Sequence, residues 1–141
     1  MTFQELSQKL PNGFHDAELV RFEMDYLNRR ITCNLLVWIG DMENESGREM
    51  YRPARLILDE VAYLAIEPPD IRYNWLVPGA VVVDTGEGHP RKGTYSLPDP
   101  PPGTSAIWFY LRQTNSFLNL AVGNAFLEWT GPEENRGKDK K

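Results

Sequence analysis

The titratable residues that could do chemistry gather first at His15, Asp16 and Glu18. Imidazole and carboxylate groups can bind a metal ion or transfer protons. In an extended strand, however, Asp16 and Glu18 would share one face and His15 would point to the other. We therefore expect that three ligands do not converge from this segment, and that the candidate functional pair His15 and Asp16 orients the chain where a strand begins.

A metal site would need a further ligand from elsewhere, and the second histidine of the chain is His89. The alternative set is His15, Asp16 and His89, which would make the protein a small metal- or ligand-binding β protein with a hydrolase-like site. His89 falls in an irregular stretch, 85–103, and no spacing in the sequence brings it to the pair. The prediction is therefore that the protein has no metal and no other cofactor.

Other catalytic and ligand-binding motifs are incomplete in this sequence. The stretch 88–94 (GHPRKGT) resembles a phosphate-binding loop, but its lysine precedes the second glycine and Pro90 removes a backbone amide. No serine lies in a G-x-S-x-G turn, and no neighbour of Cys33 would lower the pKa of its thiol. The prolines of 98–102 (PDPPP) fit a rigid spacer, or a polyproline ligand. We predict no catalytic residues, which favours binding over catalysis.

Charge and aromatic residues indicate the kind of partner. The chain has 20 acidic and 15 basic residues and a net charge of −5, which disfavours nucleic acid. Polar loop 40–49 is rich in carboxylates, and the irregular segment 68–79 carries aromatic side chains that are either a binding lip or a cover over the core. The candidate partner-binding residues are Asp41, Glu43, Glu45, Tyr73 and Trp75.

The sequence also bears on location. No stretch approaches the roughly 20 apolar residues of a membrane-spanning helix, so we expect no membrane contact. The single cysteine, Cys33, excludes an internal disulfide and is typical of a reducing compartment. A cytoplasmic protein is expected.

A predicted β-hairpin over Phe14–Ile39 would position these residues. Both of its runs alternate between apolar and polar residues, and Asn28 stands in the short polar turn between them. The apolar positions are Val20, Phe22, Met24 and Tyr26 in the first run and Ile31, Cys33, Leu35, Val37 and Ile39 in the second. Before the hairpin, Thr2 and Glu5 have the spacing of a capping box, which predicts a short helix from about residue 3 to about 10.

Extended runs follow to the end of the chain. We predict strands at 50–58, where Pro53 indicates an edge strand or a bulge, and at 61–67, 80–83, 104–112, 117–122 and 125–130. Gly123 and Asn124 have the pattern of a two-residue hairpin turn. The predicted fold is mainly β: an antiparallel sheet, as a sandwich or partly open barrel, of seven to eight strands with one short N-terminal helix. A single domain covers 1–130, and 131–141 is predicted to be a disordered polar tail.

The order F-H-D-A, an alternating strand, a basic turn and L-L-V-W-I resembles a group of small bacterial proteins of unknown function, and it is similar to the immunity protein 50 family of polymorphic toxin systems. The segments 61–70 (VAYLAIEPPD) and 115–129 (NSFLNLAVGNAFLEW) also resemble the pattern of this group. The resemblance implies a β-rich domain with a toxin-neutralising or other binding role. Segment 85–103 has no counterpart in it.

The sequence thus predicts a non-enzymatic bacterial binding protein, of the immunity type, whose acidic surface neutralises a basic toxin domain. The two alternatives are the small site at His15, Asp16 and His89, and a homodimeric structural domain joined through an edge strand.

Overall fold

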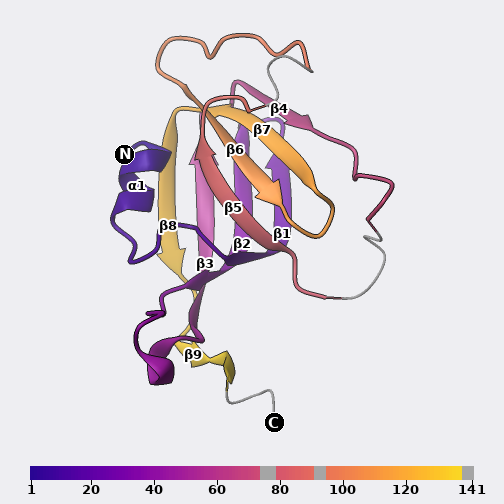
Figure 1. Ribbon diagram of the computed structural model, residues 1–141. Coiled ribbons are helices and arrows are strands. Elements are labelled where there is room, and N and C mark those ends of the chain that lie inside the picture. Colours follow the sequence, from indigo (N-terminus) through magenta and orange to yellow (C-terminus); the bar gives the residue numbers. More distant parts are fainter. Residues whose placement is uncertain (74–78, 91–94, 138–141) are drawn as a thin grey trace.

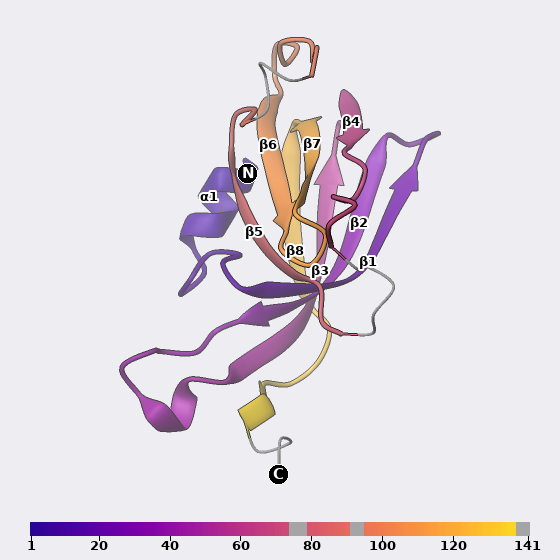
Figure 2. The same ribbon diagram turned by 45° about the vertical axis from the view of Figure 1, so that its right-hand side comes forward.

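The protein folds into one antiparallel sheet with a short helix at its N-terminus (Figures 1 and 2). The computed structural model describes residues 1–73, 79–90 and 95–137. These residues confirm the predicted mainly β class and contain nine strands. In chain order the elements are α1 (Phe3–Gln8), β1 (Ala17–Asp25), β2 (Arg30–Trp38), a 3-10 turn (Glu45–Gly47), β3 (Met50–Asp59), β4 (Tyr63–Ile66), β5 (Val82–Glu87), β6 (Ser105–Leu111), β7 (Ser116–Val122), β8 (Asn124–Trp129) and β9 (Glu134–Asn135).

The strands pair in the order β4-β7-β6-β5-β1-β2-β3-β8, and β9 adds to β3. The sheet curls around its apolar face, but its outer strands β4 and β8 do not pair with each other, so it is not closed into a barrel. Chain neighbours β3 and β4 therefore lie far apart in the pairing order, as do β7 and β8.

The predicted helix is confirmed and lies against β8 (Figure 1). The Thr2 hydroxyl caps its first turn by accepting a hydrogen bond from the Glu5 amide at 3.1 Å. The rings of Phe3 and Phe14 stack with centroids 5.0 Å apart, and Phe109 of β6 is 5.8 Å from Phe3. These aromatic contacts fix the helix over one end of the core, close to the place where β1 begins.

The hairpin of β1 and β2 is confirmed, with one correction in β1. The predicted face of β2 is buried from Ile31 to Val37. In β1 a bulge between Leu19 and Arg21 leaves Val20 unpaired and 66% exposed. Tyr26, at the hairpin tip, is 80% exposed, so only Phe22 and Met24 of the predicted face pack against the core.

The predicted hairpin at Gly123 and Asn124 is wrong. Strand β7 pairs with β4 and β6, whereas β8 pairs with β3, so the chain turns a corner here instead of folding back. The Gly123 amide donates to the Asp59 carbonyl at 3.0 Å, and a Cβ at this position would collide with the Glu60 side chain. Glycine is needed for this close approach.

The position of Pro53 also differs from the prediction. It lies in β3, between β2 and β8, and pairs in register with Leu36, so it marks neither an edge strand nor a bulge. Its carbonyl accepts a hydrogen bond from the Thr130 amide, just beyond the last residue of β8. Because the N–H and C=O of one residue point to the same side in an antiparallel strand, the missing N–H faces the side where β8 ends.

Two segments are more regular than predicted. Strand β5 continues to Glu87, into the stretch expected to be irregular. The predicted disordered tail is wrong for residues 131–137, because β9 pairs with the start of β3; residues 138–141 lie outside the described residues. In the described part of the chain, no helix is long and apolar enough to cross a membrane.

Candidate functional site

The pair His15 and Asp16 lies directly before β1, in the turn that leads out of α1. Asp16 has a φ of 59°, in the left-handed region, so the alternation of a strand does not apply to it. Its carboxylate Oδ2 lies 3.4 Å from His15 Nε2. The prediction that the two side chains point to opposite faces is therefore wrong, because β1 begins only at Ala17, after both residues.

Two further charged residues reach this pair from neighbouring strands. Asp84 of β5 places Oδ1 2.6 Å from His15 Nδ1. Arg112, directly after β6, donates from Nε and Nη2 to Asp84 Oδ2 at 3.0 and 2.8 Å, and it also forms an ion pair with Asp16. We call His15, Asp16, Asp84 and Arg112 the ion-pair quartet. It ties the start of β1 to β5 and to the end of β6.

Opposite charges within the quartet balance one another. Burial alone would raise the pKa of Asp84, but the hydrogen bonds from Arg112 and His15 outweigh it and hold that pKa below its usual value. Burial also opposes the charge of Arg112, yet the neighbouring Asp84 and Asp16 raise the pKa of its guanidinium. Each carboxylate thus has a cationic partner within the quartet.

One atom from each of His15, Asp16 and Asp84 could serve as a metal ligand, and these atoms lie within 4.8 Å of one another. The Arg112 guanidinium, however, already binds both carboxylates. A metal cation would have to displace it or approach a positive charge at close range. The quartet is better suited to holding three segments together; an orienting role for His15 and Asp16 stays a prediction.

His89 lies elsewhere, so the set His15, Asp16 and His89 is not brought together. It follows the far end of β5, and the strand from Asp84 to Glu87 alone spans roughly 10 Å. Its Nε2 forms a hydrogen bond with the Tyr63 hydroxyl, which also donates to the Pro98 carbonyl at 3.0 Å. His89 and Tyr63 thus attach the loop after β5 to strand β4.

The predicted partner-binding residues Asp41, Glu43 and Glu45 are exposed on the loop between β2 and β3. The base of this loop is fixed from within the fold. The Trp38 indole donates to the Arg48 carbonyl at 2.7 Å, and the Asn12 amide donates to the Gly40 carbonyl at 2.8 Å. The loop is therefore a defined projection at one end of the sheet (Figure 1).

Strand β9 brings two more carboxylates to the same end of the molecule (Figures 1 and 2). Asn135 pairs with Met50, and its side-chain amide donates to the Ser46 carbonyl at 3.2 Å. The Arg136 amide donates to the Glu49 carbonyl at 2.9 Å. We call the five exposed acidic residues gathered in this way the acidic lobe: Asp41, Glu43, Glu45, Glu133 and Glu134.

Two nearby arginines bind groups other than the lobe carboxylates. The Arg136 guanidinium turns away to Glu18 at 2.6 Å, and the Arg48 guanidinium donates to the Met42 carbonyl at 3.1 Å. Within residues 1–73, 79–90 and 95–137, the five lobe carboxylates form no ion pair. Met42, 61% exposed, stands between Asp41 and Glu43 in this loop. Among the described residues, the lobe therefore combines carboxylates that form no ion pair with an exposed apolar side chain.

The aromatic candidates are not part of the lobe. Tyr73 is 43% exposed. It belongs to the segment after β4, and Figure 1 shows this segment on another side of the molecule from the loop between β2 and β3. Its amide donates to Asp70, whose carboxylate binds the Asn115 side chain at 3.1 Å. Trp75 lies outside the described residues.

Sequence reasoning missed Asp84 and Arg112, and it assigned Glu133 and Glu134 to a disordered tail. Asp84 follows an apolar run and Arg112 ends an alternating one, so their positions at strand ends were visible, but the pairing of β5 with both β1 and β6 was not. Nothing in the composition of 131–137 predicted that two residues would add to β3.

Comparisons with known proteins leave the family open. No protein-family model and no curated protein matches the sequence. A solved structure of an uncharacterized protein from Neisseria gonorrhoeae is similar in part, with 10% sequence identity, coverage of 82% of this chain and 92% of that chain, and a TM-score of 0.43. The resemblance to the immunity protein 50 family stays a prediction.

Proposed function

We propose that the protein is a cytoplasmic bacterial binding protein that acts without catalysis and engages a basic protein surface through the acidic lobe. A toxin domain neutralised by an immunity-type protein is a partner of this chemistry. The observation that carries the proposal is the addition of β9 to β3, which gathers carboxylates from two distant parts of the chain on one projection. Buried, unreactive Cys33 agrees with a reducing compartment, since burial raises the pKa of its thiol to about 12.

Charge is the physical basis of this recognition. Like charges held on one projection repel one another, and a partner of opposite charge relieves that repulsion and is steered toward the lobe. Exposed Met42 supplies apolar surface in the middle of the charges, and apolar contact strengthens an interface that charge alone would leave weak and salt-sensitive.

The alternatives are supported less well. A hydrolase-like site at His15, Asp16 and His89 would need a different position for His89. A homodimer joined through an edge strand would use β4 or β8, and the Met1 carbonyl and α1 already lie against β8.

The test is co-expression of the tagged protein with the product of the adjacent gene, followed by calorimetric titration of the two purified proteins. Four substitutions, Glu43→Gln, Glu45→Gln, Glu133→Gln and Glu134→Gln, neutralise the lobe and change the net charge from −5 to −1. Binding should weaken at least tenfold, and raising NaCl from 0.1 to 0.5 M should weaken binding of the wild type in the same direction.

A matched control separates local charge from total charge. Four exposed carboxylates on other parts of the surface, Glu5, Glu23, Glu87 and Glu128, are changed to Gln, which also gives a net charge of −1. This variant should bind within about twofold of the wild type. Equal weakening in both variants, or no complex at micromolar concentration, would contradict the proposal.

A further inference from the structure

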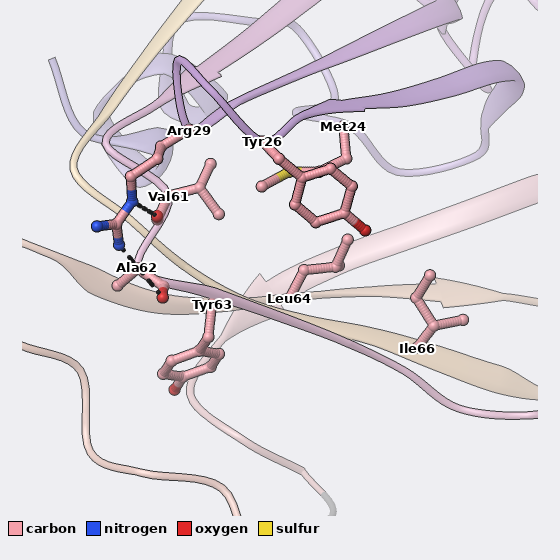
Figure 3. A pocket seen from close by; sticks show the side chains of 8 residues that line it. All are labelled: Met24, Tyr26, Arg29, Val61, Ala62, Tyr63, Leu64 and Ile66. Carbon is pink, nitrogen blue, oxygen red and sulfur yellow. Dashed lines mark hydrogen bonds between the residues drawn. The ribbon is translucent and has the colours of Figure 1, made fainter.

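A cleft separates the tip of the β1–β2 hairpin from strand β4 (Figure 3). Its volume is about 580 Å³, which is in the range of ligand-binding pockets. Met24 and Tyr26 face Leu64 and Ile66 across it, while the Tyr63 side chain points away. Ile66 is 65% exposed at its mouth, so apolar surface here is left open to solvent.

The outer edge of β4, which runs along this cleft, is an edge of the described sheet. The Glu67 amide donates to the Phe117 carbonyl of β7. In an antiparallel ladder alternate residues turn to the same side, so Tyr63 and Ala65 also face β7, and the N–H and C=O of Leu64 and Ile66 face outward. No described strand pairs with this side of β4. An extended peptide could add there as a further strand.

A positive charge stands at one end of the cleft. The Arg29 side chain donates from Nε to the Val61 carbonyl at 2.8 Å and from Nη2 to the Ala62 carbonyl at 3.4 Å (Figure 3). These contacts orient the guanidinium but leave its charge uncompensated, since no described carboxylate forms an ion pair with it. Arg29 lies beside the start of β4, where a strand added antiparallel to β4 would end.

We propose that this cleft binds the carboxyl-terminal end of an extended apolar peptide, antiparallel to β4, with its terminal carboxylate at Arg29. Leu64 and Ile66 supply the backbone hydrogen bonds, and alternate side chains of the peptide enter the space beside Met24 and Tyr26. The positive charge of Arg29 selects a ligand with a carboxylate. The open edge of β4 selects a ligand in an extended conformation. This site is separate from the acidic lobe, whose charge would repel the same carboxylate.

The probe is a fluorescent peptide, Gly-Ser-Gly-Thr-Val-Thr-Val, with a free carboxyl terminus, titrated with the full-length protein and followed by anisotropy. It has no lysine or arginine, so the acidic lobe has nothing to attract. We expect saturable binding that weakens at least tenfold when the terminus is amidated. The lobe variant with four Gln substitutions should bind the peptide like the wild type, so failure of the proposed function would leave this result unchanged.

Ile66→Lys places a charge at the mouth of the cleft and should weaken peptide binding at least tenfold. Val20→Lys is the matched control, because Val20 is 66% exposed on the bulge of β1 and should leave binding unchanged. A circular dichroism melt checks that both variants are folded. Equal binding of acid and amide peptides, or an unchanged affinity of Ile66→Lys, overturns the proposal.

Two other occupants would also overturn it. Palmitate binding at this cleft without any peptide binding would assign it to a lipid. A dimer in sedimentation that Ile66→Lys dissociates would assign the edge to a second copy of the chain.

Discussion

The ion-pair quartet and the acidic lobe are both surface clusters of carboxylates, but they differ in how their charge is balanced. In the quartet, Asp16 and Asp84 each contact Arg112 and His15. In the lobe, none of the five carboxylates has an ion pair among the described residues. A balanced cluster stabilises the chain that contains it, whereas an unbalanced one leaves charge available to a partner. We therefore assign the first to the fold and the second to binding.

Removing the cation of the quartet should have the largest effect on stability. Arg112→Met leaves Asp16 and Asp84, both half-buried, beside each other without the guanidinium that separates their charges. The free energy of unfolding in urea should fall by about 1–2 kcal/mol, less than for a fully buried pair because Arg112 is partly exposed. A loss of unfolding free energy below about 0.5 kcal/mol would contradict a structural role of the quartet.

The pH dependence of stability should follow from Asp84. Its pKa is lower in the folded protein than in the unfolded chain, so the unfolded state takes up protons first as the pH falls. The contribution of Asp84 is present above about pH 4, the usual pKa of an aspartate, and is lost as the pH falls through the lower pKa of the folded state. Urea melts from pH 6 to pH 2.5 should show this loss in the wild type, and a shallower one in Arg112→Met.

A smaller and local effect is expected where β9 is attached to the loop. Asn135→Ala removes the hydrogen bond to Ser46, worth about 1 kcal/mol. Backbone amides of 45–49 should exchange faster with solvent, while those beside the quartet stay unchanged. Asn28→Ala is the control, because it removes a comparable bond to Asp25 at another exposed turn. Equal exchange in 45–49 in both variants would show that β9 does not order the lobe.

The smallest change in stability should come from the lobe itself. Glu43→Gln, Glu45→Gln, Glu133→Gln and Glu134→Gln alter only exposed groups that form no ion pair with a described residue. The free energy of unfolding should therefore change by less than about 0.5 kcal/mol, toward greater stability as repulsion is relieved. Thermal melts at low and high salt measure the shift. Destabilisation as large as that of Arg112→Met would contradict the assignment of the quartet to the fold and of the acidic lobe to binding.

Local pattern predicted the elements well, because alternation reports burial on one face. The buried positions of β2 and the cap at Thr2 are read directly from residue types. Pairing between distant strands is not encoded in such patterns, and the errors follow from this. Gly123 has the signature of a hairpin, yet the chain turns a corner here, since β7 pairs with β4 and β6 while β8 pairs with β3.

The candidate sites also differ in how far the sequence alone could predict them. The exposed loop carboxylates, such as Asp41, could be predicted from composition, since a polar run without periodicity stays in solvent. The quartet could not, because Asp84 and Arg112 reach His15 only through the pairing of β5 with β1 and β6. The left-handed backbone at Asp16 also overrides the strand geometry that the sequence suggested.

Amide hydrogen exchange of the protein alone and in complex with its co-purified partner tests the division of roles most directly. The account predicts that binding slows exchange at 41–49 and 131–136, and that the amides of His15, Asp16 and Asp84 exchange at the same rate in both states. Slower exchange at the quartet, with no change in the acidic lobe, would contradict it.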